Sequence, residues 1–221
     1  WDVAVRMEDA SAPGAKGQRR RRPQKTAPPR WDDREDISPF KLAEKKFRRY
    51  KGVQTDFSAA IDVSSLGGGA VAVAVDGHDG LYVLPGWLTA AEQLGLAAKC
   101  LEEYPEPPHR TNLTPHFGEV SQVWSTRPDA MAALRWCTLG YQYDWTQRTY
   151  PPGSFLPFPE ELRSLGARAA EACGLPTLTP EAAIVNYYNQ DSTLGGHVDD
   201  AEEDTTAPIV SISLGCAAVF L

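Results

Sequence analysis

The sequence predicts an α+β fold, in which a β-sandwich or jelly roll carries helices packed on one face. Residues 89–104 and 157–174 show the apolar periodicity and end signals of helices. From about residue 176 onward, short apolar segments alternate with turns that contain Gly and Asp, which is typical of such a sheet. Hydrophobic residues make up 42% of the 221 residues and charged residues 23%, so the chain can bury a core.

The first 36 residues are predicted to form a disordered, basic, Pro-rich arm, because they show little apolar periodicity. The arginine run at 19–22 suits a nuclear address, a phosphate-binding arm or a solvated linker. Most of the 22 Lys and Arg residues precede residue 52, whereas the net charge is −7. Any contact with nucleic acid phosphates is therefore expected to be local.

Residues 37–80 are predicted to be an amphipathic helix followed by a linker. Apolar residues recur at helical spacing within 38–51, and Ser38 and Pro39 suit the first turn. This basic helix could dock its apolar face on the domain or contact phosphates. The Gly- and Ala-rich stretch 64–80 reads as a bridge to the globular domain, which spans 81–221.

Within that domain, end signals define the helices. Thr89 is a suitable N-cap for helix 89–104, and a short helical turn is expected around Trp124. In the helix at 157–174, Pro159 lies in the first turn and Gly174 provides the stop.

The strands follow from apolar, β-branched and aromatic segments between these helices. A strand and turn are expected at 81–88, and a longer strand from Leu134 to Trp145. Two more are expected at 181–189 and 207–215. The apolar run 207–221 stops at Leu221, so we expect a fragment that lacks its C-terminal part and an incomplete sheet.

Composition also bounds the environment. The four cysteines are widely spaced and contain no C-x-x-C pair, which indicates reduced thiols rather than a disulfide framework or a zinc site. No stretch approaches the length of a transmembrane helix, so no membrane association is expected. We expect an intracellular protein of the nucleus, the cytoplasm or an organelle such as a mitochondrion or plastid, with no evident stable protein partner.

A candidate metal site lies in the stretch NYYNQDSTLGGHVDD, residues 186–200. His197 and Asp199 are two residues apart, so in a strand they would project from the same face. An imidazole and a carboxylate are two of the three ligands of a 2-His-1-carboxylate site for non-haem Fe(II). H-x-D alone is a weak signal. However, Asn186 and Tyr188 alternate onto one face of the preceding strand, and an amide and a phenol suit an anionic cosubstrate.

The segments LRWCTLGYQYDW, PFPEEL and AAIVNYYNQDSTLGGHVDD occur in this order along the chain, and together they are far more specific than any one of them. With them the chain resembles the AlkB family of Fe(II)/2-oxoglutarate-dependent nucleic-acid dioxygenases, on the branch of AlkB homologue one. The resemblance extends from about Phe40 to Leu221. It implies a double-stranded β-helix, with Fe(II) as metal and 2-oxoglutarate as cosubstrate.

The resemblance also implies roles for individual residues. His197 and Asp199 match the first two iron ligands, and Asn186, Tyr187 and Tyr188 match the Asn-x-Tyr segment that holds 2-oxoglutarate. The residues implied at the substrate are Trp124, Tyr141, Gln142, Tyr143 and Asp144. For Trp124 and for one of the two tyrosines, core packing is an equal alternative. Tyr141 and Tyr143 would share a face of a continuous strand and could stack on a base.

The implied activity is oxidative demethylation of N-methylated bases, such as methyladenine in tRNA or DNA, with O₂ consumed and formaldehyde and succinate released. The family pattern also has a distal His and carboxylate-clamping arginines, which this chain is expected to lack, since His78, His109 and His116 lie upstream. The fragment itself is therefore expected to turn over little. The alternatives are a protein hydroxylase of the same fold and a non-catalytic jelly-roll module that binds nucleic acid or protein.

Overall fold

The protein is described from a computed structural model of residues 1–221. The structure describes the backbone of 2–8 and the residues 72–75, 79–144, 149–189, 192, 194–195, 197, 204, 206–216, 218 and 220. The predicted helix at 38–51 lies outside these residues, as do His78 and Asp199.

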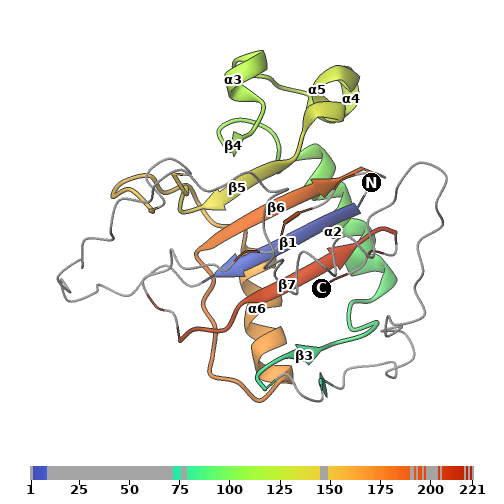
Figure 1. Ribbon diagram of the computed structural model, residues 1–221, viewed down its shortest axis with the longest axis vertical. Coiled ribbons are helices and arrows are strands. Elements are labelled where there is room, and N and C mark those ends of the chain that lie inside the picture. The colour runs from blue at the N-terminus through green and yellow to red at the C-terminus, as the bar shows by residue number, and fades with distance from the viewer. Residues whose placement is uncertain are drawn as a thin grey trace, which may run out of the picture.

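A five-stranded antiparallel sheet forms the centre of the fold, in the order β4-β5-β6-β1-β7 (Figure 1). Its strands are β1 (Asp2–Glu8), β4 (Arg110–Thr111), β5 (Trp136–Gly140), β6 (Ala182–Tyr188) and β7 (Val210–Leu214). A separate two-stranded sheet pairs β2 (Val73–Ala74) with β3 (Tyr82–Val83). The predicted mixed fold of helices and strands is confirmed. The described residues show no closed barrel, so the jelly-roll arrangement stays a prediction.

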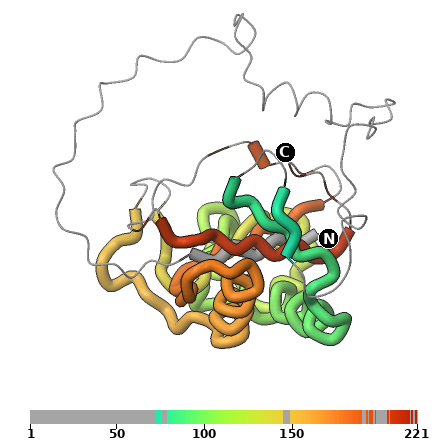
Figure 2. Tube along the Cα trace, turned by 90° about the horizontal axis from the view of Figure 1, so that it is seen from below, coloured from blue at the N-terminus to red at the C-terminus, as the bar shows by residue number. Residues whose placement is uncertain are grey.

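Two helices, α2 (Ala90–Glu102) and α6 (Glu160–Ala172), lie on the same side of the sheet (Figure 2). Three short helices form a lobe beyond β4 and β5. They are α3 (Thr114–Phe117), α4 (Val123–Thr126) and α5 (Pro128–Ala133). Among the helices described, none has the length and apolar character to cross a bilayer.

The core fills the space between the sheet and the two long helices. The sheet contributes alternate residues from three strands, namely Cys137, Leu139, Ala183, Val185, Tyr187, Ile212 and Leu214. The helices contribute Leu96, Cys100, Leu162 and Leu165. Because side chains alternate along a strand, the intervening residues lie on the opposite face, which α2 and α6 do not cover and which is called the uncovered face. The fold therefore gives the sheet one apolar face and one face available for polar side chains.

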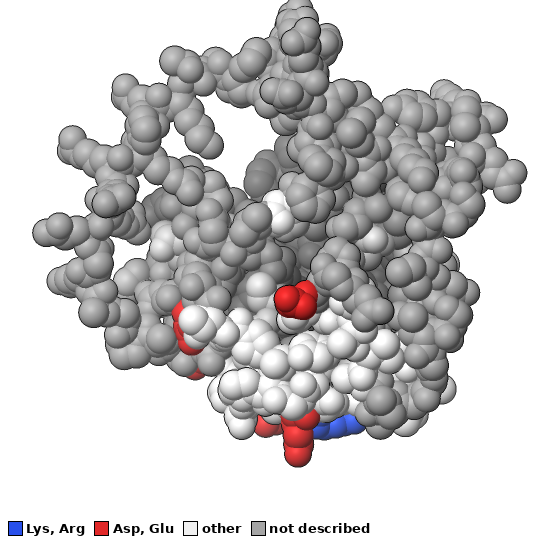
Figure 3. Space-filling view, turned by 60° about the horizontal axis from the view of Figure 1, so that its bottom comes forward, with Lys and Arg blue, Asp and Glu red and all other residues white. Residues whose placement is uncertain are grey.

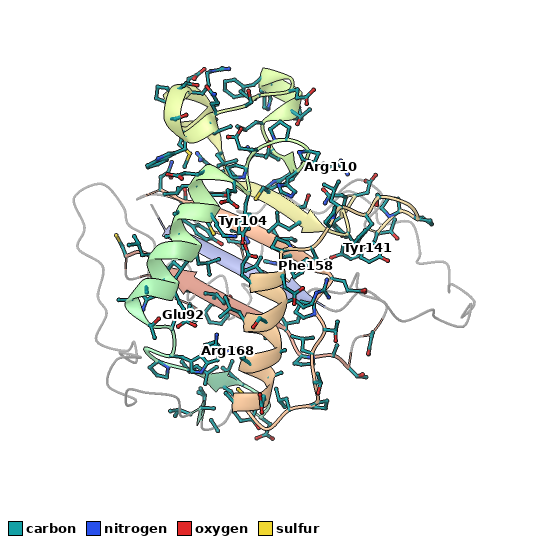
Figure 4. All side chains as sticks on the ribbon, turned by 180° about the vertical axis from the view of Figure 1, so that it is seen from behind. Glu92, Tyr104, Arg110, Tyr141, Phe158 and Arg168 are labelled. Atoms are coloured by element: carbon teal, nitrogen blue, oxygen red, sulfur yellow. The ribbon has the colours of Figure 1, made fainter. Side chains whose placement is uncertain are left out.

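Helix α2 begins as predicted. The backbone N–H of Glu92 donates to the Thr89 hydroxyl (3.2 Å), and the Glu92 carboxylate accepts from the backbone N–H of Thr89 (2.8 Å). This reciprocal capping box satisfies two backbone donors at the helix start. The Glu92 carboxylate also accepts from Arg168 of α6 at 2.9 Å, which joins the two helices (Figure 4).

A second polar contact joins α2 and α6. Glu161 of α6 accepts hydrogen bonds from Lys99 (2.6 Å) and from the Tyr104 hydroxyl (2.8 Å). Burial raises the pKa of the Tyr104 phenol well above its ordinary value, helped by the Glu161 carboxylate, so Tyr104 stays a proton donor. The two helices therefore form a fixed support for the sheet.

The segment Asp2–Glu8 differs from expectation, since it forms a strand and is not part of a disordered arm. It pairs in antiparallel register with β6 and with β7, and so lies between them. The alternation of Val3, Val5 and Met7 with other residues is a strand pattern, but it is short and is outweighed by the Arg- and Pro-rich stretch after it.

The strand predicted at 134–145 is shorter than expected. It begins at Trp136 and ends at Gly140, whose φ of 71° is favourable only for glycine. An added Cβ at Gly140 would lie 1.9 Å from the carbonyl oxygen of Glu181. Gly140 therefore permits both the turn and a close approach to the residue before β6.

Candidate metal and cosubstrate site

Asn186 and Tyr188 share the uncovered face of β6. Asn186 lies opposite Trp136 of β5 on one side and opposite Ala4 of β1 on the other. Both Asn186 and Tyr188 are half-buried, and neither belongs to the core beneath the sheet. Burial raises the pKa of the Tyr188 phenol, which keeps it a hydrogen-bond donor at neutral pH. An amide and a neutral phenol on one face can both donate to a carboxylate.

Tyr187 lies between them and points the opposite way. It is 1% exposed, and its hydroxyl donates to the carbonyl oxygen of Cys100 in α2 at 2.5 Å. The sulfur of Cys137 lies 3.5 Å from the same hydroxyl. The structure thus places Tyr187 in the core, on the face away from Asn186 and Tyr188. Its contacts are those of an anchor between sheet and helix.

A turn leads from β6 toward the histidine of the H-x-D motif. The backbone N–H of Ser192 donates to the Asn189 carbonyl (2.9 Å), and the backbone N–H of Asn189 donates to the Ser192 hydroxyl (3.1 Å). These bonds tie Ser192 to Asn189 directly after the strand that carries Asn186.

His197 is exposed and lies outside any strand that the structure describes. Its Nδ1 lies 2.8 Å from the carbonyl oxygen of Gly195. A carbonyl oxygen only accepts, so this contact favours the tautomer with the proton on Nδ1 and the lone pair on Nε2. That is the form in which a neutral imidazole binds a metal, with its other nitrogen oriented by a hydrogen bond. Val198 and Asp199 lie outside the described residues, so the pairing of His197 with Asp199 stays a prediction.

The available donors fit an iron and 2-oxoglutarate site. An imidazole suits Fe(II), and the uncovered face of β6 offers an amide and a phenol for an anionic cosubstrate. His197 and, by prediction, Asp199 would hold the metal, whereas Asn186 and Tyr188 would hold the cosubstrate.

The predicted substrate residues 141–144 lie at the other end of β5. Trp136 lies beside Asn186, and Gly140 is four residues further along β5. The two positions are therefore roughly 13 Å apart along the strand. Tyr141 is half-buried and packs against Phe155, with ring centroids 4.9 Å apart. Tyr143 is 9% exposed and packs against Tyr150. The two tyrosines therefore pack against different aromatic partners, and Tyr143 is the more buried of the two.

Gln142 is buried between them. Its side-chain oxygen accepts from the Thr138 hydroxyl at 2.6 Å, and its side-chain nitrogen donates to the Gly140 carbonyl at 2.9 Å. Its backbone N–H donates to the Ser154 carbonyl at 2.9 Å. These bonds close the turn after β5, so Gln142 fixes the shape of this turn. Asp144 is half-buried and pairs through its backbone with Thr149.

Trp124 lies in the lobe, in α4, and is 42% exposed. The lobe is organised by Glu106, whose carboxylate accepts the backbone N–H groups of Gln122 (2.6 Å) and Val123 (2.7 Å). Trp124 is therefore presented toward solvent by a fixed helical turn and does not anchor the core.

The two other described histidines differ in burial. His116 is exposed in α3. Burial lowers the pKa of His109, which favours its neutral form.

Two residues that the sequence did not single out lie beside the predicted ones. Trp136 is opposite Asn186, and Phe155 contacts Tyr141. The alternation of β5 could have placed Trp136 on the uncovered face. Phe155 follows the Pro-Pro-Gly-Ser stretch 151–154, which reads as a loop, so no local pattern identified its ring as part of a surface.

Comparison with known proteins identifies the family of the chain. A family model described as the 2OG-Fe(II) oxygenase superfamily matches residues 80–221. The chain therefore belongs to this superfamily, and the prediction of Fe(II) and 2-oxoglutarate is confirmed.

Its relatives specify the branch. The chain is 34% identical over 166 residues to "Nucleic acid dioxygenase ALKBH1" of Mus musculus. The matched region covers 68% of this chain and 43% of that protein. It is 31% identical over 232 residues to "DNA N(6)-methyladenine demethylase ALKBH1A" of Arabidopsis thaliana, covering 86% and 65%. It is 29% identical over 223 residues to "tRNA demethylase abh1" of Schizosaccharomyces pombe, covering 85% and 74%. The resemblance to the AlkB homologue one branch is confirmed, although the chain spans less than half of the mouse relative.

Proposed function

We propose that the protein is an Fe(II)- and 2-oxoglutarate-dependent demethylase of N-methylated bases in nucleic acid, with methyladenine in tRNA or DNA as substrate. The single observation that carries the proposal is the division of β6 into two faces. Asn186 and Tyr188 are on the uncovered face and Tyr187 is in the core, within a chain of the 2OG-Fe(II) oxygenase superfamily. The names of the relatives supply the substrate class, since they act on DNA and tRNA.

In this proposal the amide of Asn186 and the phenol of Tyr188 donate hydrogen bonds to the carboxylate of 2-oxoglutarate. Both groups are carried by one strand whose other face is locked to α2, so their spacing is fixed before the cosubstrate binds. A preformed pair of donors loses little conformational entropy on binding.

His197 and Asp199 are the proposed metal ligands on this chain. In the tautomer with the proton on Nδ1, His197 donates to the Gly195 carbonyl and would bind the metal through Nε2. When bound, Fe(II) supplies the oxidation by O₂: one oxygen atom enters the N-methyl carbon, and the other converts 2-oxoglutarate into succinate and CO₂. The hydroxymethyl group then leaves the base nitrogen as formaldehyde, and the nitrogen takes up a proton.

We further propose that the described sheet is one layer of a double-stranded β-helix. Its uncovered face carries the polar residues of the site and would face the second layer. The target base has to leave its stack to reach this face, so an unpaired or flipped base is the expected substrate. The protein is accordingly expected in an intracellular compartment that contains tRNA or DNA.

The test is stoichiometric turnover by the full-length protein with oligonucleotides that contain methyladenine, in the presence of Fe(II), 2-oxoglutarate and O₂, because the 221-residue chain itself is expected to turn over little. We expect formaldehyde and succinate to appear in equal amounts, and both to be lost in His197→Ala and Asp199→Ala. A protein that consumes 2-oxoglutarate with peptides and with no methylated oligonucleotide would be a hydroxylase of the same class. If neither substrate class is turned over and His197→Ala leaves oligonucleotide affinity unchanged, the protein is a binding module and the proposal is wrong.

A further inference from the structure

The turn after β5 carries an aromatic pair, Tyr141 and Phe155, which has no part in the proposed binding of the metal or of 2-oxoglutarate. Tyr141 and Phe155 are 14 residues apart along the chain, and their backbones form an isolated β-bridge. Their ring centroids are 4.9 Å apart with planes tilted by 56°. Phe155 is 47% exposed, although a phenylalanine ring gains most when it is buried. An exposed aromatic ring held against a second ring is a surface that can accept another flat group.

The position of this pair is rigid. The backbone N–H of Tyr141 donates to the Glu181 carbonyl (3.0 Å), and that of Leu156 donates to the Gly140 carbonyl (3.0 Å). Both flanks of the pair are thus bound to the edges of β5 and β6. The buried side chain of Gln142 closes the turn from inside. A rigid ring pair loses little entropy when a ligand stacks on it.

A positive charge lies on the same flank of the sheet. Arg110 of β4 is exposed and lies opposite Thr138 of β5. The Thr138 hydroxyl that holds Gln142 lies 3.5 Å from the Arg110 carbonyl oxygen, so Arg110 and the turn that carries Tyr141 adjoin the same residue. Figure 4 shows Arg110 and Tyr141 on this one flank. On the face drawn in Figure 3, the described residues are mostly uncharged, with a few acidic side chains and one basic patch at the lower edge.

We propose that Tyr141, Phe155 and Arg110 form a strand-holding rim, on which an unpaired base stacks against the Tyr141–Phe155 pair while Arg110 contacts a backbone phosphate. Stacking on aromatic rings combined with a nearby cation is how proteins hold single-stranded nucleic acid without reading its sequence. The rim lies roughly 13 Å along β5 from the strand position beside Asn186, so it would hold a nucleotide neighbouring the target. The inference rests on the proposed function only for the identity of the ligand as a nucleic acid.

The experiment measures binding without turnover. A fluorescein-labelled, unmethylated single-stranded DNA 12-mer and the duplex of the same sequence are titrated with the 221-residue chain, without iron or 2-oxoglutarate, and anisotropy is recorded. We expect the single strand to bind more tightly than the duplex. We expect Phe155→Ala to raise the Kd for the single strand about tenfold. Phe155→Tyr should retain the affinity, whereas Phe155→Leu, which keeps apolar bulk without a ring, should not.

The contact with phosphate has its own readout. In Arg110→Ala the slope of log Kd against log salt should fall by about 0.7, which corresponds to one phosphate contact with a single strand, and Arg110→Lys should restore it. Leu94→Ala, at an exposed apolar position on α2, and Arg168→Gln, on the helix-covered side, are matched controls that should change neither affinity nor slope.

The inference is overturned if Phe155→Ala binds within twofold of the unmodified chain, or if Phe155→Leu binds as well as Phe155→Tyr. A loss of affinity that Leu94→Ala shares would equally reject it. Because the probe carries no methyl group, the two proposals fail separately. A protein that demethylates oligonucleotides but ignores Phe155→Ala contradicts only the rim, and one that binds through the rim without turnover contradicts only the proposed function.

Discussion

The hydroxyl of Tyr187 lies 2.5 Å from the carbonyl oxygen of Cys100, although the two residues are 87 positions apart in the sequence. This bond joins the middle of the sheet to α2. It holds Tyr187 in the core, and because side chains alternate along β6, Asn186 and Tyr188 face the other way. Tyr187, which lies between the two residues proposed to bind 2-oxoglutarate, therefore stabilises the fold and does not itself face the cosubstrate.

Replacing Tyr187 by Phe should separate stability from cosubstrate binding. The change removes one buried hydrogen bond and leaves the Cys100 carbonyl without this donor, so we expect the free energy of unfolding to fall by about 1 to 2 kcal/mol. The affinity for 2-oxoglutarate should stay within twofold. Urea denaturation and calorimetric titration with 2-oxoglutarate, with Mn(II) in place of Fe(II), would measure both.

Replacing Asn186 by Ala should give the opposite pattern. The side chain is half-buried on the uncovered face, and its loss removes a proposed hydrogen bond to a charged carboxylate, worth about 1.5 to 3 kcal/mol. We expect 2-oxoglutarate to bind at least tenfold more weakly while the urea midpoint changes little. An Asn186→Ala protein that binds 2-oxoglutarate normally but unfolds early would show that Asn186 is structural.

Elements with local signals were predicted well from the sequence. The helix that starts at Thr89 and the strand that carries Asn186 have end signals or alternation that depend on neighbouring residues only. What could not be predicted depends on residues far apart in sequence. The insertion of Asp2–Glu8 between β6 and β7, and the contact of Tyr141 with Phe155, are set by tertiary pairing, to which local patterns are blind. The early end of β5 was predictable only in part. The sequence shows a glycine at position 140, but it does not show that the Glu181 carbonyl lies next to it.

The capping box of α2 predicts a pH dependence. The pKa of Glu92 is lowered to about 2 because its carboxylate accepts hydrogen bonds from the backbone and hydroxyl of Thr89 and from Arg168. A carboxyl whose pKa is lowered by folding stabilises the fold above its ordinary pKa of 4.5, and this stabilisation is lost as the pH falls toward 2. Glu92→Gln should therefore lower the Tm at pH 7, and the difference from the unmodified protein should shrink between pH 5 and pH 2. Glu171→Gln, at an exposed position of α6, is the control, and an equal Tm difference at pH 7 and pH 2.5 would contradict the prediction.

Gly140 provides a stability test with an internal control. Its φ is 71°, and a Cβ there would lie 1.9 Å from the Glu181 carbonyl oxygen and 2.8 Å from the Phe158 ring. Gly140→Ala therefore combines an unfavourable backbone conformation, about 1 to 2 kcal/mol, with a displacement of packed backbone that costs about 1 to 3 kcal/mol more. Gly153 has a similar φ of 79° but no atom within 4 Å of the added Cβ. We expect Gly153→Ala to show only the backbone part, so the two variants should differ by about 1 to 3 kcal/mol in the free energy of unfolding measured with urea. The clash in Gly140→Ala lies directly before Tyr141, so this variant alone should also weaken the binding of single-stranded DNA. If the two substitutions lower the free energy of unfolding equally, the turn after β5 is not held against Glu181.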